Sequence, residues 1–280
     1  MKINCDIRYP SHQDDAKHYD TATLRKHYLI ENLMVADEIN MTYSMFDRIV
    51  AGGAVPVNEE LTLTPPAEIR SEYFTQRREL GIINVGGDGI VKVDDKEYRL
   101  AKTEALYVGR GNKKISFKSI DKEAPAYFYF NSCPAQCAYP DKMVSLKDAV
   151  VMHAGSMEGS NDRTINRLIV KEVVQTCQLQ MGLTQLKPGS TWNTMPAHTH
   201  DRRMEVYFYF DVPEGQAVCH FMGQPQETRH IWMQNHQAVI SPQWSIHSAC
   251  ATSNYTFIWG MCGENDDYDD MDWCETPDLR

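Results

Sequence analysis

Two histidines stand two positions apart in the C-terminal half of the chain, at His198 and His200, and Glu205 follows five positions after the second. Residues i and i+2 of a β-strand point to the same side, so both imidazoles are expected to face one interior. Glu205 has the opposite parity on an uninterrupted strand, so we expect a turn or bulge at residues 201–203. That break would direct the carboxylate to the two imidazoles and form a chelating group.

A third histidine, His247, completes this set from a distant part of the chain, after a turn at Pro242. A barrel is the architecture that brings such a residue, expected on another strand, beside the first three. Three neutral imidazoles and one carboxylate suit Zn, Fe, Mn, Ni or Co, and they are poor ligands for Ca or Mg. A His-x-His pair alone also arises by chance, and a lone strand histidine is most often a core residue. The four-part pattern therefore predicts one divalent-metal site.

Other polar side chains near these motifs could take part in proton transfer or substrate binding. If Glu205 faces inward, strand alternation places Tyr207 and Tyr209 on the same side, and His220 lies on a further expected strand. These three are catalytic candidates, the alternative being hydrogen-bonded wall or core residues. A guanidinium group is the natural partner of a carboxylate. The arginines that could bind a substrate carboxylate are Arg163, Arg202, Arg203 and Arg229.

The surrounding chain is rich in strand signals. Short runs of Val, Ile, Tyr and Phe recur between Gly, Pro, Asn and Asp turns, which is typical of a sandwich or barrel and not of alternating βαβ units. The expected strands include residues 41–50, 81–85, 90–93, 105–108, 126–130, 177–186, 206–210, 217–222, 238–240 and 255–259. Asp20, followed by apolar residues at positions 24, 28, 29 and 33, predicts one short amphipathic helix near the N-terminus. The predicted fold class is mainly all-β.

An internal repeat indicates two barrels in tandem. Residues 77–79 and 202–205 each precede an apolar strand, and Lys114 and His247 each follow an alanine by nine positions. We expect an N-terminal barrel over residues 1–150 and a C-terminal barrel over residues 151–280, with a linker around residues 141–163. The first-barrel positions that match the four ligands read Tyr73, Thr75, Glu79 and Lys114. This set cannot hold a transition metal, so only the second barrel is expected to bind one.

Composition excludes several classes of partner. The chain has 280 residues, with 28 Lys and Arg against 38 Asp and Glu, for a net charge of −10. That charge repels nucleic-acid phosphates and anionic membranes, so neither is an expected partner. No apolar run approaches a membrane span or a targeting segment, and the eight cysteines lack paired spacing, so we expect a cytoplasmic protein with reduced thiols. The acidic end, residues 264–278, is interpreted as a solvated tail or an oligomer contact.

The spacing of the four candidate ligands resembles the cupin signature, in which a His-x-His-x(3 or 4)-Glu segment is completed by a late His after a Pro turn. The resemblance becomes more specific over residues 193–210, 222–230 and 238–247, which are similar to the 5-keto-4-deoxyuronate isomerases of pectin breakdown. It continues through residues 77–87, 105–109 and 255–261. The similarity therefore spans nearly the whole chain.

This resemblance implies a bicupin, made of two tandem double-stranded β-helix (jelly-roll) barrels, that assembles as a homohexamer. It also implies one Zn²⁺ per subunit, held by the residues matching His198, His200, Glu205 and His247. The implied reaction converts a small deoxy-keto-uronate, 4-deoxy-L-threo-5-hexosulose uronate, to 3-deoxy-D-glycero-2,5-hexodiulosonate. Such an aldose to ketose shift moves a proton through an enediol, and a cation that binds the oxygens stabilises the developing negative charge.

Two alternative functions stay open at the level of the residues. Three histidines and one glutamate also hold Fe(II), so an iron-dependent cupin dioxygenase is possible on chemical grounds. A non-catalytic sugar-binding or storage cupin is the other alternative, although a complete ligand set in one barrel argues against it. Metal analysis coupled to a ketol-isomerase assay distinguishes the three.

Overall fold

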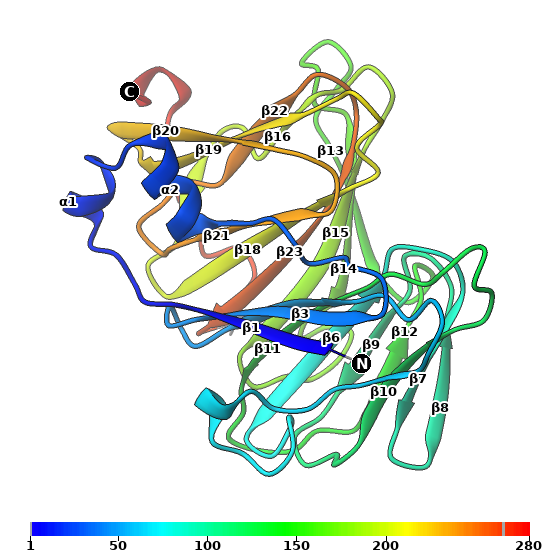
Figure 1. The fold of residues 1–280 in the computed structure, drawn as a ribbon. Coiled ribbons are helices and arrows are strands. Elements are labelled where there is room, and N and C mark those ends of the chain that lie inside the picture. Colours follow the sequence, from blue (N-terminus) through cyan, green and yellow to red (C-terminus); the bar gives the residue numbers. More distant parts are fainter. Residues whose placement is uncertain (1, 265–266) are drawn as a thin grey trace. The chain divides into compact units, whose positions relative to one another are not determined.

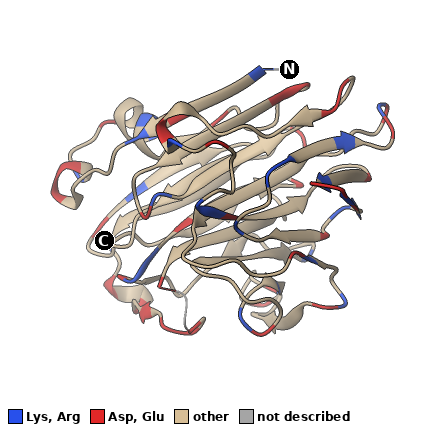
Figure 2. Ribbon diagram, turned by 90° about the horizontal axis from the view of Figure 1, so that it is seen from below, with Lys and Arg blue, Asp and Glu red and all other residues tan. Residues whose placement is uncertain are grey.

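Strands dominate the computed structural model of this chain, which describes residues 2–264 and 267–280. The mainly all-β fold class predicted from the sequence is therefore confirmed. Charged residues of both signs are interspersed along loops and strand ends, whereas most strand segments carry other residue types (Figure 2). Among the described residues, no helix is both long enough and apolar enough to cross a membrane.

The chain divides into two compact units, each built from discontinuous segments. Unit 1 comprises residues 1–8, 32–150 and 167–181, and unit 2 comprises residues 9–31, 151–166 and 182–280. Residues 9–31 are thus counted with the C-terminal part of the chain, and residues 167–181 with the N-terminal part. Two strands, β14 and β15, cross from one unit to the other along their length.

Unit 1 contains a seven-stranded sheet of order β1-β3-β4-β11-β6-β9-β12 and a four-stranded sheet of order β5-β10-β7-β8. The elements are β1 (Lys2–Arg8), β3 (Glu38–Ser44), β4 (Val50–Ala54), β5 (Leu61–Thr62), η1 (Ala67–Ile69), β6 (Arg78–Asn84), β7 (Gly89–Val93), β8 (Lys96–Leu100), β9 (Ala105–Val108), β10 (Ile115–Ser119), β11 (Phe128–Pro134) and β12 (Lys142–Val144). Their inward faces form one buried apolar cluster that includes Leu80, Ile82, Phe117 and Phe130. The interior of this unit is thus filled by side chains.

Unit 2 holds most of a second seven-stranded sheet, of order β13-β14-β15-β23-β18-β21-β2, and a four-stranded sheet of order β16-β22-β19-β20. A short two-stranded sheet pairs β17 with β24. The strands are β2 (Leu29–Ile30), β13 (Val150–Ala154), β14 (Arg163–Ile169), β15 (Leu179–Leu186), β16 (Trp192–Asn193), β17 (His198–Thr199), β18 (Arg203–Phe210), β19 (Val218–Gln224), β20 (Glu227–Met233), β21 (Gln237–Ser241), β22 (Ser248–Ala251), β23 (Thr256–Gly263) and β24 (Asp272–Trp273). Figure 1 shows β18 lying between β21 and β23, to both of which it pairs antiparallel.

The same strand order recurs in the two sets of sheets. The run β4-β11-β6-β9 corresponds to β15-β23-β18-β21, and β5-β10-β7-β8 corresponds to β16-β22-β19-β20. The corresponding strands of the two sets also occur in the same order along the chain. This shared order supports the interpretation of the chain as two repeats of one barrel.

Short helices precede the strands of unit 2. They are α1 (Gln13–Ala16) and α2 (Thr21–Tyr28), and a short 3₁₀ turn, η2 (Thr276–Asp278), lies near the C-terminus. The predicted helix is α2, and the Asp20 carboxylate caps it by accepting a hydrogen bond from the Thr23 N–H at 2.8 Å. The helix ends at Tyr28, because Leu29 and Ile30 pair with β21 as a strand. Helix α2 lies beside β20 and β21 (Figure 1).

The stretch of residues 141–163, predicted as the linker, includes a boundary between the two units at residues 150–151, and it is not irregular throughout. It contains β12 and β13, and β14 begins at its end. Val151 and Met152 on β13 are 47% and 38% exposed. Since β13 is an edge strand and most of its residues are exposed, its polar neighbours and glycines looked like a loop in the sequence.

Glu79 does not occupy the position in unit 1 that Glu205 occupies in unit 2. On β6, Leu80 and Ile82 belong to the apolar interior, so Glu79 and Gly81 point to the opposite face. A Cβ added at Gly81 would collide with the Met181 sulfur and with the side chains of Ile169 and Leu179, so these residues cover the outer face of β6. Pairing Glu79 with Glu205 was therefore wrong by one residue, which on a strand exchanges the two faces.

The Glu79 carboxylate instead holds the segment before β15. It accepts hydrogen bonds from the backbone N–H groups of Cys177, Gln178 and Leu179 at 2.7–2.8 Å and from the Tyr107 hydroxyl at 2.8 Å. Burial raises the pKa of Glu79, and the three N–H groups oppose that rise by favouring the charged form. The role of this buried carboxylate is structural.

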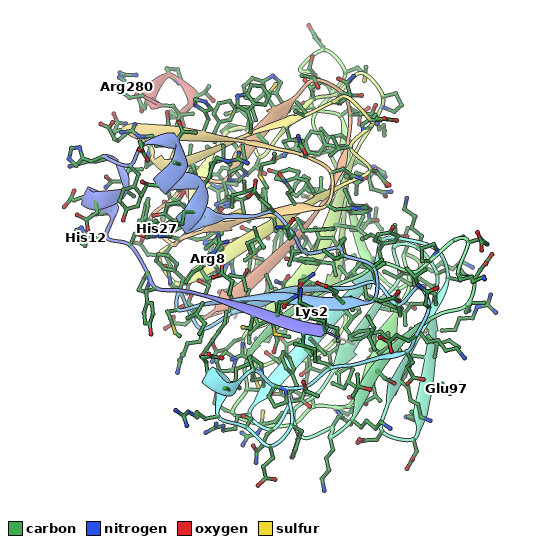
Figure 3. The ribbon with its side chains drawn as sticks, in the orientation of Figure 1. Lys2, Arg8, His12, His27, Glu97 and Arg280 are labelled. Atoms are coloured by element: carbon green, nitrogen blue, oxygen red, sulfur yellow. The ribbon has the colours of Figure 1, made fainter. Side chains whose placement is uncertain are left out.

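Removing the charge of Glu79 should destabilise the protein measurably. We expect Glu79→Gln to lower the free energy of unfolding by about 2 kcal/mol or more, because the amide turns a donor towards N–H groups that need an acceptor. Urea-induced unfolding measures this effect. The matched control is Glu97→Gln on the exposed face of β8 (Glu97 is labelled in Figure 3), which should cost less than about 0.5 kcal/mol. Equal stabilities of the two variants would contradict the assignment.

Candidate metal centre

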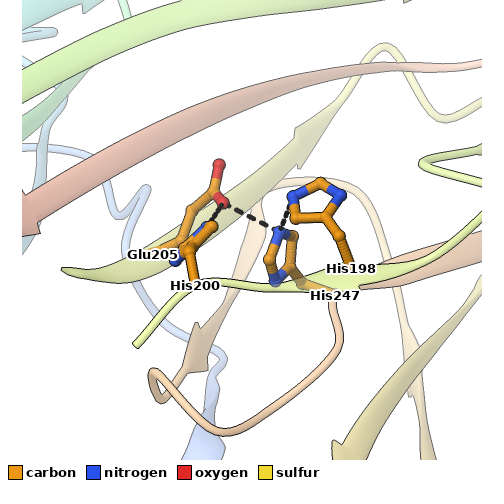
Figure 4. Close-up of side chains that lie close together, drawn as sticks. All are labelled: His198, His200, Glu205 and His247. Carbon is orange, nitrogen blue, oxygen red and sulfur yellow. Dashed lines mark hydrogen bonds and ion pairs between the residues drawn. The ribbon is translucent and has the colours of Figure 1, made fainter. Parts of the chain in front are cut away.

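Four buried side chains converge in unit 2, namely those of His198, His200, Glu205 and His247 (Figure 4). Each offers one ligand atom, and these atoms all lie within 4.8 Å of one another. The His247 Nε2 lies 2.9 Å from the His198 Nε2 and 3.0 Å from a Glu205 carboxylate oxygen. The His200 Nε2 lies 3.2 Å from the same oxygen. Among the described residues, this is the only such cluster that could hold a metal ion.

Local chain geometry brings the first three side chains together. His198 lies on β17, His200 follows it, and a turn at residues 201–202 precedes β18, which begins at Arg203. The predicted break between His200 and Glu205 is thus confirmed. His247 lies in the loop directly before β22 and not on a strand as expected.

Hydrogen bonds at the far ring nitrogens orient two of the imidazoles. The His200 Nδ1 lies 2.8 Å from the Arg203 carbonyl oxygen, and the His247 Nδ1 lies 3.4 Å from the Ser245 carbonyl oxygen. A carbonyl only accepts, so Nδ1 carries the proton and Nε2 presents its lone pair to the cluster. Several lone pairs that face each other at about 3 Å repel unless a cation or a proton lies between them. The donor set therefore fits a divalent metal.

Burial and charge act differently on the members of the cluster. Although burial opposes it, the hydrogen bond and the charge of Glu205 raise the pKa of His200. Burial, reinforced by the neighbouring His247, holds the pKa of His198 well below its ordinary value. Burial alone would raise the pKa of Glu205, but the adjacent imidazoles of His247 and His200 hold it below its ordinary value. Neutral histidine and ionised glutamate are the forms that bind metal ions.

A cavity of about 270 Å³ opens from this cluster within unit 2. His198, His200 and Glu205 form one part of its lining, and apolar side chains such as Phe257 and Trp259 form another. Its other polar lining includes Arg163, Thr194 and Tyr207. A mainly apolar hollow with a few convergent polar groups is typical of a small-molecule site.

Only one of the three catalytic candidates lines the cavity. Tyr207 lines the cavity, its ring centroid lies 5.4 Å from that of His247, and its hydroxyl lies 3.0 Å from the Thr194 hydroxyl. Tyr209 and His220 are not among the cavity-lining residues, and they bond to each other at 2.8 Å between the Tyr209 hydroxyl and the His220 Nδ1. Burial lowers the pKa of His220 to about 3. Thr194 is a polar cavity residue that sequence reasoning missed.

The four candidate arginines differ in whether they line the cavity and in whether they pair with a carboxylate. Arg163 lines the cavity, and its Nη1 donates to the Asn161 carbonyl at 2.9 Å. Arg202 pairs at the surface with Asp270, and Arg229 pairs with Glu227 at 2.9 Å and donates to the Lys17 carbonyl. Arg203 is fully buried and pairs with Asp270 at 2.7 Å. Among the described residues, Arg163 makes no ion pair.

The acidic end, residues 264–278, of which 265–266 lie outside the described residues, is not simply a solvated tail. Tyr268, Asp269, Met271 and Trp273 line the cavity, and β24 pairs with β17 so that Trp273 lies opposite His198. Arg280, labelled in Figure 3, donates its backbone N–H to the Pro225 carbonyl at 3.0 Å. The aromatic residues within this acidic stretch were the signal that could have indicated a structured segment.

Comparisons with known proteins agree with this architecture. The chain is 57% identical to 4-deoxy-L-threo-5-hexosulose-uronate ketol-isomerase 1 of Bacteroides thetaiotaomicron and 58% identical to the ketol-isomerase of the same name from Formosa agariphila, in both cases over 100% of each chain. Among solved structures, an IolB-like protein from Salmonella typhimurium superposes with a TM-score of 0.66 at 17% identity, covering 81% of this chain and 87% of that one. Oxalate decarboxylase from Lactobacillus farciminis superposes with a TM-score of 0.53 at 9% identity, covering 77% of each chain.

The two structural likenesses concern the fold alone, because their sequence identities are low. The sequence relationship is much closer, since the relatives match over their full lengths. A sequence profile of the KduI/IolB family matches residues 28–278, which include all four residues of the cluster. The chain belongs to the KduI/IolB family.

Proposed function

We propose that this protein is a 4-deoxy-L-threo-5-hexosulose-uronate ketol-isomerase that acts in the breakdown of pectin-derived uronates. The observation that carries the proposal is the buried His198, His200, Glu205 and His247 cluster at a cavity that also contains Arg163. The activity named for relatives that are 57–58% identical over the full chain supports it. The product is 3-deoxy-D-glycero-2,5-hexodiulosonate.

The cofactor of this proposal is one Zn²⁺ per chain, held by the four residues of the cluster. Three imidazoles and a carboxylate are ligands that zinc accepts, and the isomerisation exchanges no electrons with an outside reagent. When bound, zinc supplies Lewis acidity that stabilises negative charge on the substrate oxygens. The family resemblance of the sequence also favours zinc.

Arg163 is the proposed partner of the substrate carboxylate. It is the cavity-lining arginine, and it makes no ion pair within the described parts of the chain. Burial lowers the pKa of its guanidinium, which remains a cation at neutral pH because the ordinary pKa of arginine is so high. A partly buried cation of this kind is stabilised when an anion binds beside it, so it favours a uronate over a neutral sugar.

The Tyr207 and Thr194 hydroxyls are proposed to orient the hydroxyl and carbonyl groups of the substrate. They lie 3.0 Å apart on the cavity wall. Burial, together with the charge of nearby Glu205, raises the pKa of Tyr207 well above its ordinary value. A hydroxyl that keeps its proton donates hydrogen bonds, so we assign Tyr207 the role of a hydrogen-bond donor. Its place in the cavity beside His247 makes it the proposed proton relay. Tyr209 and His220 do not line the cavity, and we propose that this hydrogen-bonded pair helps to hold Tyr207 in position.

The proposal extends to assembly and location. We propose a homo-oligomer, with a hexamer implied by the resemblance of the sequence, that works in the cytoplasm. Val151 on the edge strand β13 exposes apolar surface that would suit contact with another copy. The mass of the purified protein in solution, measured by light scattering, tests the assembly.

A direct assay tests the activity. The zinc-loaded protein is incubated in D₂O with 4-deoxy-L-threo-5-hexosulose uronate, and the products are followed by NMR. We expect the ketose product, with deuterium at the former aldehyde carbon wherever the transferred proton exchanges with solvent. An oxygen electrode should record no consumption. An unchanged substrate would refute the proposal, and oxygen uptake would instead favour a dioxygenase.

A further inference from the structure

The C-terminal wall, defined as residues 267–274, closes one side of the cavity in unit 2. Strand β24 pairs with β17, and the ring centroid of Trp273 lies 5.0 Å from that of His198. The Cys274 N–H donates to the Ala197 carbonyl at 2.9 Å. Tyr268 and Met271 also line the cavity. The wall is thus in direct contact with a residue of the metal cluster.

The buried side chain of Arg203 binds this wall. Its side chain is fully buried, and its guanidinium donates to the Asp267 carbonyl at 2.7 Å and to the Tyr268 carbonyl at 2.9 Å. It also forms an ion pair with Asp270 at 2.7 Å. The two Nη groups of the planar arginine fork donate to two carbonyls and lie near a carboxylate, whereas the point charge of lysine cannot reach all three.

The backbone of the same residue supports the metal cluster. The carbonyl oxygen of Arg203 lies 2.8 Å from the His200 Nδ1 and fixes the orientation of that ring. Arg203 is the first residue of β18, two positions before Glu205. One residue therefore contacts a candidate ligand through its main chain and the cavity wall through its side chain.

We propose that Arg203 is a positioning residue that couples the metal cluster to the C-terminal wall, so that a bound metal keeps the wall closed over the substrate. The inference rests on the proposed metal site, and it assigns Arg203 to the wall instead of to the substrate carboxylate. Since Trp273 lies against His198 and Arg203 holds both His200 and the wall, ordering the cluster also orders residues 267–274. Coupling of this kind is reciprocal, so a closed wall strengthens metal retention.

Limited proteolysis with zinc as the only added ligand tests this coupling without an activity assay. Chymotrypsin cleaves after aromatic residues, and Tyr268 and Trp273 both lie in the wall. In the native protein, we expect zinc to slow cleavage at these sites about tenfold or more relative to protein treated with a chelator. In Asp270→Asn, which leaves the main chain of Arg203 intact, cleavage should be fast with and without zinc, and because the coupling is reciprocal a chelator should remove its zinc more readily than that of the native protein.

The matched control is Arg202→Gln. Arg202 pairs with the same Asp270 but is 46% exposed, and surface pairs contribute little, so its zinc protection should equal that of the native protein. Arg203→Lys provides a second buried variant, and its circular dichroism spectrum shows whether it folds. With the uronate substrate, both buried variants should raise KM about tenfold while the control stays native.

Distinct outcomes separate this inference from the proposed activity. Native zinc protection in Asp270→Asn would overturn the coupling, as would a chelator-treated native protein that resists cleavage as well as the zinc form. Loss of zinc from Asp270→Asn with a wall that still resists chymotrypsin would also overturn it, because Asp270 would then act on the metal alone. A native protein that binds zinc and shows protection but leaves the uronate unchanged would refute only the proposed function.

Discussion

Replacing His247 with alanine should remove both the bound zinc and the isomerase activity. The His247 Nε2 lies within about 3 Å of both the His198 Nε2 and the Glu205 carboxylate, so this imidazole joins two of the other ligands. A Lewis acid contributes several kcal/mol to such a reaction, which corresponds to a loss of roughly a thousandfold or more in kcat/KM. Elemental analysis and the ketol-isomerase assay measure the two losses on the same sample.

A buried histidine outside the cluster serves as the control. His220 is fully buried in the same unit, but it bonds to Tyr209 and is not part of the cluster. His220→Gln should therefore keep about one zinc per chain, whatever its effect on turnover. A His247→Ala protein that retained stoichiometric zinc, or that stayed fully active without zinc, would contradict the assignment of the cluster.

Local sequence rules were sufficient to predict that His198, His200 and Glu205 lie together. Strand parity predicted that His198 and His200 face one side, and the odd spacing of Glu205 required the break that occurs at residues 201–202. These rules concern only a few consecutive residues, so no tertiary information was needed. His247 required one more assumption, that the fold is a barrel, and it lies in a loop and not on the expected strand.

The C-terminal wall could not be predicted because its contacts are nonlocal. Arg203 donates to carbonyls at Asp267 and Tyr268, more than sixty residues away, and main-chain acceptors leave no signature in a sequence. Asp270 looked like one acid among many in an acidic stretch. Charge composition alone therefore suggested solvent exposure where the fold places a cavity wall.

The alignment of the two repeats was wrong at Glu79, again because the contacts that decide the position are nonlocal. Matching letters aligned Glu79 with Glu205, but cross-strand packing places Leu80 in the interior of unit 1. A shift of one residue changes the face on which a strand side chain lies, and an alignment by eye does not resolve such a shift. The conclusion that unit 1 lacks this ligand set does not depend on the shift. Within its described residues, unit 1 contains no comparable cluster.

The choice among the arginines depended on burial and on ion-pair partners, which only the structure provides. Arg202, Arg203 and Arg229 each pair with a carboxylate, whereas Arg163 lines the cavity and makes no ion pair within the described residues. Arg163 is partly buried and lines the cavity without a carboxylate partner among the described residues, so a substrate carboxylate would stabilise it more than the other three.

Replacing Arg163 with methionine should therefore raise KM for the uronate roughly 10- to 100-fold, with a smaller change in kcat. The expected range follows from the loss of a charge-assisted hydrogen bond that the carboxylate makes in both the bound substrate and the transition state, and such uniform binding affects mainly KM. Zinc content should stay native, because Arg163 is not part of the cluster. Steady-state kinetics and elemental analysis on one preparation measure these quantities.

Two controls distinguish carboxylate binding from a general disturbance of the cavity. Arg229→Met removes the same charge from unit 2 at a residue that does not line the cavity, so its KM should stay native. An analogue with a primary alcohol in place of the carboxylate should react no worse with Arg163→Met than with the native protein, because the variant has lost only the group that recognises the anion. A native KM for the uronate in Arg163→Met, or an equal loss with both substrates, would show that another residue binds the carboxylate.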